Sequence, residues 1–212
     1  MEKVSFVTSD GITIEGNYWP GSNTGVLLLH MMPSTKQSWN NFAKILNENG
    51  FSVLAIDLRG HGESTKQGNK KLDFRKFSDA EHQSSLQDVE DGIQYLKKRG
   101  IEKTFISGAS IGANLALIYQ CRHPEIEKTV LLSAGLAYRG VLTEPAARML
   151  RKNQYVFMAE GSSDISSSGT AGKLGSIIKN KETRTYDTAA HGTNLFAEQP
   201  ALMKEITRWL KG

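Results

Sequence analysis

The sequence has few of the features that mark several large classes of protein. Its single cysteine, Cys121, allows no internal disulfide, so nothing in the chain requires an oxidising compartment. No apolar run approaches the roughly 20 residues that a membrane-spanning helix needs, and residues 1–10 lack the apolar stretch of a signal peptide. We therefore expect a soluble, cytoplasmic protein that does not bind membranes.

An excess of charge of one sign is also missing. The 26 basic and 22 acidic residues leave a net charge of +4, and the basic residues lie in small clusters such as Lys97-Lys98-Arg99, beside a glycine that can end a helix. No zinc-ligand spacing occurs, and no basic stripe is interleaved with aromatic residues. The sequence thus predicts no nucleic-acid partner, no metal and no organic cofactor.

The composition is that of a globular protein, with 39% hydrophobic and 23% charged residues among 212. This length suits one domain over residues 1–212, and the chain contains no internal repeat. An edge strand and a final amphipathic helix leave both a monomer and a homodimer open.

Short strand-forming runs alternate with helical patterns along the chain. Eight strands are expected, at residues 3–8, 12–19, 25–30, 52–58, 103–107, 129–133, 155–159 and 183–186. Helices are expected at 38–49, 79–99, 111–122, 144–151, 171–178 and 200–210. An opening hairpin followed by repeated strand–helix units predicts an α/β fold, with a mostly parallel eight-stranded sheet and helices on both faces.

The helix expected over 79–99 is the longest of these. Ser78 and Glu81 form a capping-box pattern at its start, and apolar residues recur along it at helical spacing. His82 lies in its first turn, so we expect this histidine to be solvated or to cap the helix.

One motif indicates chemistry. Gly108-Ala109-Ser110-Ile111-Gly112 fits the pattern G-x-S-x-G between a predicted strand and a predicted helix. Glycines flank a serine on so tight a turn because the backbone and the helix approach closely. The turn exposes the Ser110 hydroxyl at a helix N-terminus, where unpaired N–H groups favour negative charge. We therefore expect Ser110 to be a nucleophile.

Two further segments extend this pattern. Residues 57–64 read D-x-R-G-x-G-x-S after the fourth strand, and His30-Met31-Met32-Pro33 follows the third. With the serine motif, they make the chain similar to the α/β-hydrolase superfamily over essentially its whole length. In that superfamily the D-x-R-G-x-G-x-S segment is a structural turn, which implies that Arg59 and His61 are scaffold.

The resemblance also implies an oxyanion hole. Relatives carry H-G-x-P at residues 30–33, and the residue at x donates a backbone N–H to the developing oxyanion. That role falls to Met32, and Ile111, directly after the nucleophile, would supply the second N–H. Met31 replaces the glycine of the superfamily pattern, so the choice between Met31 and Met32 as donor stays open.

The resemblance further implies a catalytic triad. Relatives place the histidine after the last strand, where this chain has His191, and the acid after the seventh strand, where Asp164 follows. The order Ser110, Asp164, His191 matches the superfamily. Glu160 and Asp187 are rival acids, but Glu160 lies close to a strand end and Asp187 only four positions before the histidine.

Relatives with a lid insert many residues between the sixth and seventh strands. Here the gap is residues 134–154, enough for one short helix, so little or no cap domain is expected. Candidates for a modest apolar rim that binds substrate, each with core packing as its alternative, are Met31, Met32, Leu136, Tyr138 and Leu142. Such an open site favours short-chain esters over lipids.

The sequence thus predicts a carboxylesterase-like serine hydrolase that cleaves a small-molecule ester through an acyl-enzyme intermediate. The same triad would serve a thioesterase, lactonase, amidase, acyltransferase or perhydrolase. A non-catalytic relative that binds a ligand is the alternative from another class, and a broken triad would be its sign.

Overall fold

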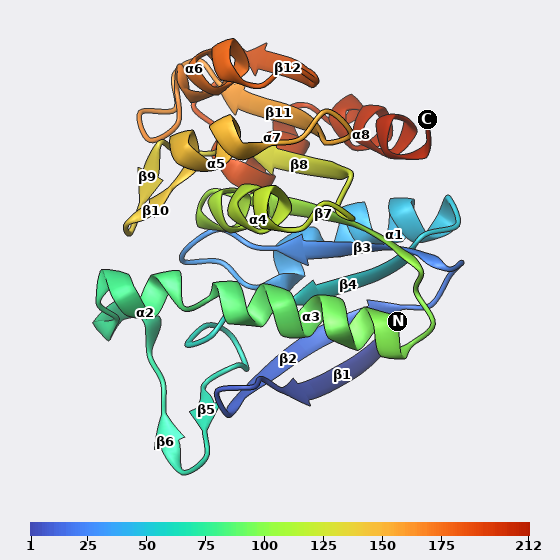
Figure 1. The fold of residues 1–212 in the computed structure, drawn as a ribbon, viewed down its shortest axis with the longest axis vertical. Helices are drawn as coiled ribbons and strands as arrows, with labels where there is room; N and C mark the ends of the chain where they lie inside the picture. Colours follow the sequence, from blue (N-terminus) through green and yellow to red (C-terminus); the bar gives the residue numbers. More distant parts are fainter.

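A sheet in which six neighbouring strands run parallel forms the centre of the structure, a computed structural model that describes all 212 residues (Figure 1). The strand order is β12-β11-β8-β7-β3-β4-β2-β5-β6, and β1 pairs with β2. The strands of this sheet are β1 (Glu2–Val7), β2 (Ile12–Trp19), β3 (Thr24–Leu29), β4 (Ser52–Ile56), β5 (Lys66–Gln67), β6 (Lys70–Lys71), β7 (Lys103–Ala109), β8 (Lys128–Leu132), β11 (Tyr155–Gly161) and β12 (Lys181–Tyr186).

Helices cover both faces of this sheet. They are η1 (Lys36–Trp39), α1 (Asn40–Glu48), η2 (Phe74–Lys76), α2 (Asp79–Gln83), α3 (Leu86–Lys98), α4 (Ile111–Arg122), α5 (Thr143–Met149), α6 (Thr170–Ile177), η3 (Gly192–Asn194), α7 (Leu195–Glu198) and α8 (Ala201–Lys211). Alternate residues of the central strands face two cores: Leu27 of β3 packs in the core beneath α3, α4, α5 and α6, and Leu28 packs in the core beneath α1, α7 and α8. Burial on both faces explains the continuous apolar runs of these strands.

All eight predicted strands are present, and the sheet gains β5 and β6. These two strands have two residues each and form a lysine-rich hairpin, in which no apolar pattern indicates strands. The prediction of one helix over 79–99 is wrong, because the chain turns between α2 and α3. Ser84 Oγ donates to the carbonyl of Ala80 at this break, a side-chain bond that competes with helix continuation. The capping box of Ser78 and Glu81 is confirmed at the start of α2.

The connection between β8 and β11 contains α5 and a small hairpin that the sequence did not predict. Its strands are β9 (Ala137–Tyr138) and β10 (Val141–Leu142). The two turn residues between them, Arg139 and Gly140, have φ values of 49° and 73°, as a tight type I′ turn requires. The expectation of little or no cap domain is confirmed, because this connection adds no separate layer.

The parallel arrangement brings the predicted site residues to one place. The carboxyl ends of β3, β7, β11 and β12 share one edge of the sheet, which we call the carboxyl edge, and their opposite ends form the amino edge. None of the helices combines the length and the apolar character needed to cross a bilayer.

Candidate active site

Ser110 lies on a strained turn between β7 and α4. Its φ of 54° and ψ of −120° fall in a region that side-chain-bearing residues rarely adopt. The flanking glycines are needed for space: a Cβ on Gly108 would overlap the carbonyl of Gly112, and a Cβ on Gly112 would overlap the carbonyl of Leu29. The turn therefore depends on the G-x-S-x-G sequence, and the serine it presents is 7% exposed.

Backbone N–H groups close to Ser110 lack hydrogen-bond partners. Ile111 is the first residue of α4, where helix N–H groups have no acceptor within the helix. The Met32 N–H, in the loop after β3, donates no backbone hydrogen bond. His30 Nδ1 lies 2.8 Å from the Met31 carbonyl oxygen, and its Nε2 accepts from the Leu58 N–H at 3.0 Å. The Met32 N–H points away from His30, because the C=O and N–H of one trans peptide have opposite directions.

A buried ion pair fixes the same loop. Lys36 Nζ and Asp57 Oδ2 are 2.5 Å apart, and both side chains are at most 1% exposed. The Asp57 carboxylate also accepts from the backbone N–H groups of Lys36, at 2.7 Å, and Glu63, at 2.9 Å. Asp57 therefore ties the loop after β3 to the turn 57–64, in which Arg59 is likewise paired with buried Asp88.

Asp164 and His191 are joined by a short hydrogen bond, with 2.6 Å between Asp164 Oδ2 and His191 Nδ1. Ser167 Oγ donates to the same carboxylate oxygen at 2.6 Å, and the Ser166 N–H donates to the other at 3.1 Å. Burial opposes the charge of Asp164, but the hydrogen bonds from Ser167 and His191 outweigh it and lower the pKa of the carboxyl. An ionised Asp164 makes Nδ1 the donor, which leaves Nε2 of His191 able to accept a proton.

Contacts of neighbouring residues bring His191 close to Ser110. The Gly192 N–H donates to Ser133 Oγ at 2.9 Å, and the Cβ of Ala109 lies 3.3 Å from the position that a Cβ on Gly192 would take. No hydrogen bond joins Ser110 Oγ to His191, whose side-chain hydrogen bond is to Asp164. Catalytic hydrogen bonds are often long in free enzymes and shorten when substrate binds.

The two rival acids have other surroundings. The Glu160 carboxylate accepts from the N–H groups of Gly169, at 3.1 Å, and Ala171, at 2.9 Å, at the start of α6. Asp187 is exposed. Of the three candidate acids, only Asp164 contacts His191.

The five predicted rim residues differ in their surroundings. Met31 packs against Gly192, next to His191, and Met32 is half-buried against the core. The Tyr138 ring lies 6.3 Å from the His191 ring, in an edge-to-face arrangement, and its hydroxyl donates to the Ser166 carbonyl at 2.9 Å. The two leucines, Leu136 and Leu142, line a shallow cavity of about 460 Å³ beside the hairpin.

Three polar residues that support the site were missed from the sequence. Ser133 Oγ accepts from the Gly192 N–H, next to His191, and Ser167 Oγ donates to Asp164. Asn114, on α4, donates to the Val141 carbonyl at 2.8 Å and accepts from the Gly135 N–H at 3.1 Å. The only signal was the Ser- and Gly-rich stretch 162–172, whose composition suits a loop at the carboxyl edge.

Two further histidines, His82 and His61, pack inside the scaffold. The prediction that His82 is solvated or caps the helix is wrong: it is 2% exposed and packs against Phe77, and burial lowers its pKa. His61 stacks on Phe74 at 3.8 Å, and burial together with nearby His30 lowers the pKa of His61 to about 3. Nowhere do three or more His, Cys, Asp or Glu side chains come together as a metal site would require.

Comparisons with known proteins show which family the chain resembles. A family model for serine aminopeptidases of the S33 type matches residues 22–191. Epoxide hydrolase B of Mycobacterium tuberculosis (strain ATCC 25618 / H37Rv) is 32% identical over 123 residues, which cover 58% of this chain and 32% of that protein. The chain spans between about a quarter and a half of the length of the curated relatives it matches.

Two esterases have a similar fold. The esterase EaEST from Exiguobacterium antarcticum superposes with a TM-score of 0.79 at 14% identity and covers all of both chains. The esterase Pf2001 from Pyrococcus furiosus also reaches 0.79, at 17% identity, over 99% of this chain and 89% of the other. Both likenesses concern the fold.

Proposed function

Because the chain belongs to the serine aminopeptidase (S33) family of α/β-hydrolases, we propose that it hydrolyses short-chain carboxylic esters with a triad of Ser110, His191 and Asp164. The observation that carries the proposal is the 2.6 Å bond between Asp164 and His191, at the sheet edge where the strained turn presents Ser110. An ordinary surface serine would have neither the strain nor the paired histidine nearby.

In the acylation step, Ser110 Oγ attacks the carbonyl carbon of the ester, and His191 Nε2 takes the proton of the Ser110 hydroxyl. The ionised Asp164 holds His191 in the required tautomer and stabilises the imidazolium that forms. The N–H groups of Ile111 and Met32 donate to the oxyanion, and removal of one such donor typically costs about 3–4 kcal/mol of transition-state stabilisation. The fixed carbonyl of Met31 favours Met32 over Met31 as the second donor.

The two products leave at different steps, the alcohol at the end of acylation and the acid after hydrolysis of the acyl-enzyme. The leaving alcohol takes the proton from His191 as the bond between carbonyl carbon and alkoxy oxygen breaks. Water then gives a proton to Nε2 and attacks the acyl-enzyme, and collapse of the second tetrahedral intermediate returns the proton to Ser110 Oγ and frees the acid.

The short connection between β8 and β11 supports the choice of small substrates. It contains only the β9–β10 hairpin and α5, so no layer of apolar side chains covers the site as a long acyl chain would need. Exposed Leu142 and half-buried Leu136 supply a modest apolar surface beside the hairpin.

The proposal is tested with a fluorophosphonate probe and p-nitrophenyl acetate. We expect wild-type protein to be labelled and to hydrolyse the ester, and we expect Ser110→Ala to lose both properties with an unchanged melting temperature. Hydrolysis retained by Ser110→Ala would remove the serine from the mechanism. A panel of ethyl acetate, a thioester and an amide of the same acyl group then measures the preferred bond, and a higher kcat/KM for the thioester or amide would contradict the ester assignment.

A further inference from the structure

The ring of Tyr138 is held in a fixed position, edge-to-face with the His191 ring. It lies over Gly135, where a Cβ would come within 2.6 Å of the ring, so only glycine leaves room for it. The hydroxyl of Tyr138 donates to the Ser166 carbonyl in the acid loop at 2.9 Å and lies 3.4 Å from the Ser133 carbonyl oxygen. The ring therefore bridges the β9–β10 hairpin and the loop that carries Asp164.

The hairpin that carries Tyr138 is itself anchored. Asn114, one turn along the nucleophile helix from Ser110, binds both the Gly135 N–H and the Val141 carbonyl and is fully buried. Thr143 Oγ1 adds a bond of 2.8 Å to the Gly135 carbonyl. With the base of the hairpin and the tyrosine hydroxyl both tied down, Tyr138 is a rigid wall of the site rather than a mobile lid.

The reaction chemistry decides which part of a substrate meets this wall. The leaving oxygen must receive its proton from His191, so the alcohol part of an ester lies against the imidazole. Tyr138 lies edge-to-face with that imidazole, at a ring separation of 6.3 Å and an angle of 86°. The carbonyl oxygen is directed instead toward the Ile111 and Met32 amides. The ring of Tyr138 thus borders the alcohol side of the site.

We propose that Tyr138 is a specificity-determining residue that limits the size of the leaving alcohol, so that esters of small, unbranched primary alcohols are the preferred substrates. This inference rests on the proposed ester hydrolysis at Ser110. The proposed role belongs to the bulk of the Tyr138 ring and not to its hydroxyl, because a rigid wall excludes substrates by size. A mismatch of one or two carbon atoms in a pocket typically changes kcat/KM by about tenfold or more.

The test measures kcat/KM for two series of esters by acetate or acid release in a pH-stat. The alcohol series compares cyclohexyl acetate with ethyl acetate, and the acyl series compares ethyl hexanoate with ethyl acetate. In Tyr138→Ala we expect the cyclohexyl-to-ethyl ratio to rise about tenfold over wild type, and the hexanoate-to-acetate ratio to change less than about threefold.

Two control variants separate the explanations. Tyr138→Phe keeps the ring and should leave both ratios within about threefold of wild type, and Tyr155→Ala removes a half-exposed tyrosine at the amino edge and should change neither. An unchanged alcohol ratio in Tyr138→Ala, or a shift in the acyl ratio instead, would overturn the inference. The same assays test the proposed function separately. If wild type hydrolyses ethyl acetate and Ser110→Ala does not, the proposed function holds even when the inference about Tyr138 fails.

Discussion

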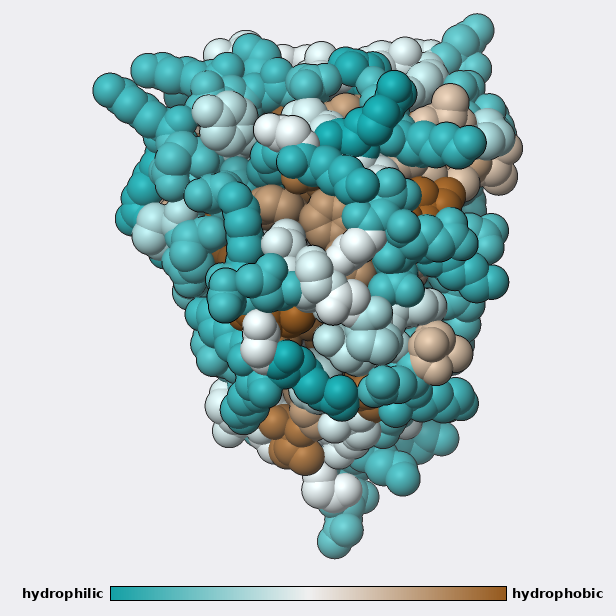
Figure 2. Space-filling model, turned by 90° about the vertical axis from the view of Figure 1, so that its right-hand side faces the viewer, coloured by the Kyte–Doolittle hydropathy of each residue, from teal (hydrophilic) through white to brown (hydrophobic).

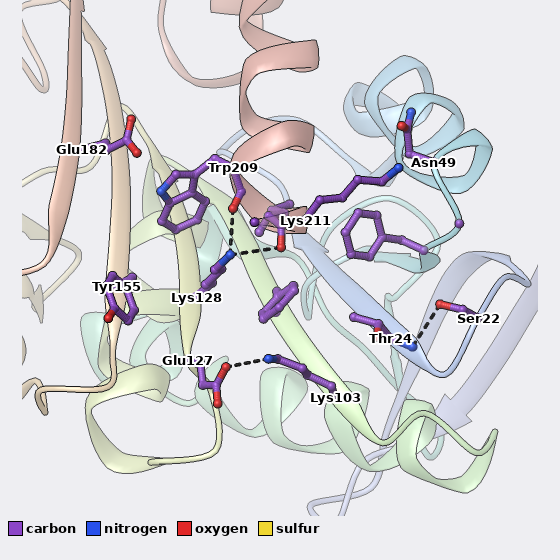
Figure 3. A pocket seen from close by; sticks show the side chains of 15 residues that line it. Ser22, Thr24, Asn49, Lys103, Glu127, Lys128, Tyr155, Glu182, Trp209 and Lys211 are labelled. Atoms are coloured by element: carbon purple, nitrogen blue, oxygen red, sulfur yellow. Dashed lines mark hydrogen bonds and ion pairs between the residues drawn. The ribbon is translucent and has the colours of Figure 1, made fainter.

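The two edges of the sheet differ in how their polar groups are partnered. The amino edge has a hollow of about 830 Å³ with an apolar floor ringed by hydrophilic side chains (Figure 2). Two of its three lysines are engaged: Lys128 Nζ donates to the carbonyls of Trp209, at 2.8 Å, and Leu210, at 3.2 Å, and Lys103 pairs with Glu127 at 2.6 Å (Figure 3). Lys128 also lies over the rings of Phe105 and Trp209.

The carboxyl edge holds groups with unused bonding capacity close to a paired histidine. The Met32 N–H has no backbone acceptor, Ser110 adopts a strained backbone conformation, and Nε2 of His191 makes no hydrogen bond. The proposed active site therefore rests on these groups and not on the volume of a hollow. Strain and unpaired groups that gather beside a paired histidine are the better sign, because they cost stability and are typically retained where they serve a function.

Loss of the proposed acid should have the largest effect on activity among the variants that keep Ser110. Replacing Asp164 with Asn removes the charge that fixes the His191 tautomer, so we expect kcat to fall by about 10³–10⁴-fold. Asp187→Asn, at the exposed rival acid, should stay within about twofold of wild type. Steady-state kinetics on p-nitrophenyl acetate measures both, and a larger loss in Asp187→Asn would transfer the role of the acid to that residue.

Replacement of a glycine in the turn that carries Ser110 should cause a large loss of stability. In Gly112→Ala the new Cβ meets the backbone of Leu29, which cannot rotate away, so we expect a loss of about 3 kcal/mol or more in unfolding free energy. Gly172→Ala is the matched control in α6, where a Cβ meets nothing within 4 Å. Because alanine favours a helix more than glycine does, this variant should gain about 1 kcal/mol in unfolding free energy. Urea unfolding compares the two, and equal losses would refute the close-approach argument.

Acid should weaken the turn 57–64, which supports the carboxyl edge. The pKa of His61 is about 3 in the folded protein and 6.5 when the residue is unperturbed. Below pH 6.5 the unfolded chain binds the proton more readily, so stability falls with falling pH until about pH 3, by about 1.4 kcal/mol per unit. Between pH 7 and pH 5, wild type should lose about 2 kcal/mol more than His61→Phe, which keeps a ring on Phe74. Parallel losses in the two proteins would show that His61 does not control this acid sensitivity.

The smallest effect is expected at the amino edge, on stability alone. Lys128→Met removes the two hydrogen bonds to the end of α8, which should cost about 1–2 kcal/mol and leave kcat unchanged. Lys103→Met breaks an exposed pair with Glu127 and should cost less than about 1 kcal/mol. A change in kcat without a change in melting temperature, in either variant, would indicate that this edge takes part in catalysis.

The sequence was sufficient for the elements whose signals are local. The apolar runs of the parallel strands and the G-x-S-x-G turn are read from neighbouring residues, and both have the expected backbone in the structure. The residues missed act over long separations: Ser133 meets Gly192 from 59 positions away, and Asn114 meets Gly135 from 21. Two predictions were wrong because helical periodicity does not show tertiary burial or side-chain hydrogen bonds. His82 is buried by packing, and the hydrogen bond from Ser84 to the Ala80 carbonyl lies at the break between α2 and α3.

The tight turn of the β9–β10 hairpin has a consequence for how access to such a site can be remodelled. Arg139 and Gly140 are exposed, whereas the hairpin's foundations at Asn114 and Thr143 are buried. A longer segment inserted between these two turn residues would project from the carboxyl edge and leave the buried contacts of the hairpin intact, because exposed loop tips tolerate insertion best. One insertion site could thus add a lid to a scaffold that has none.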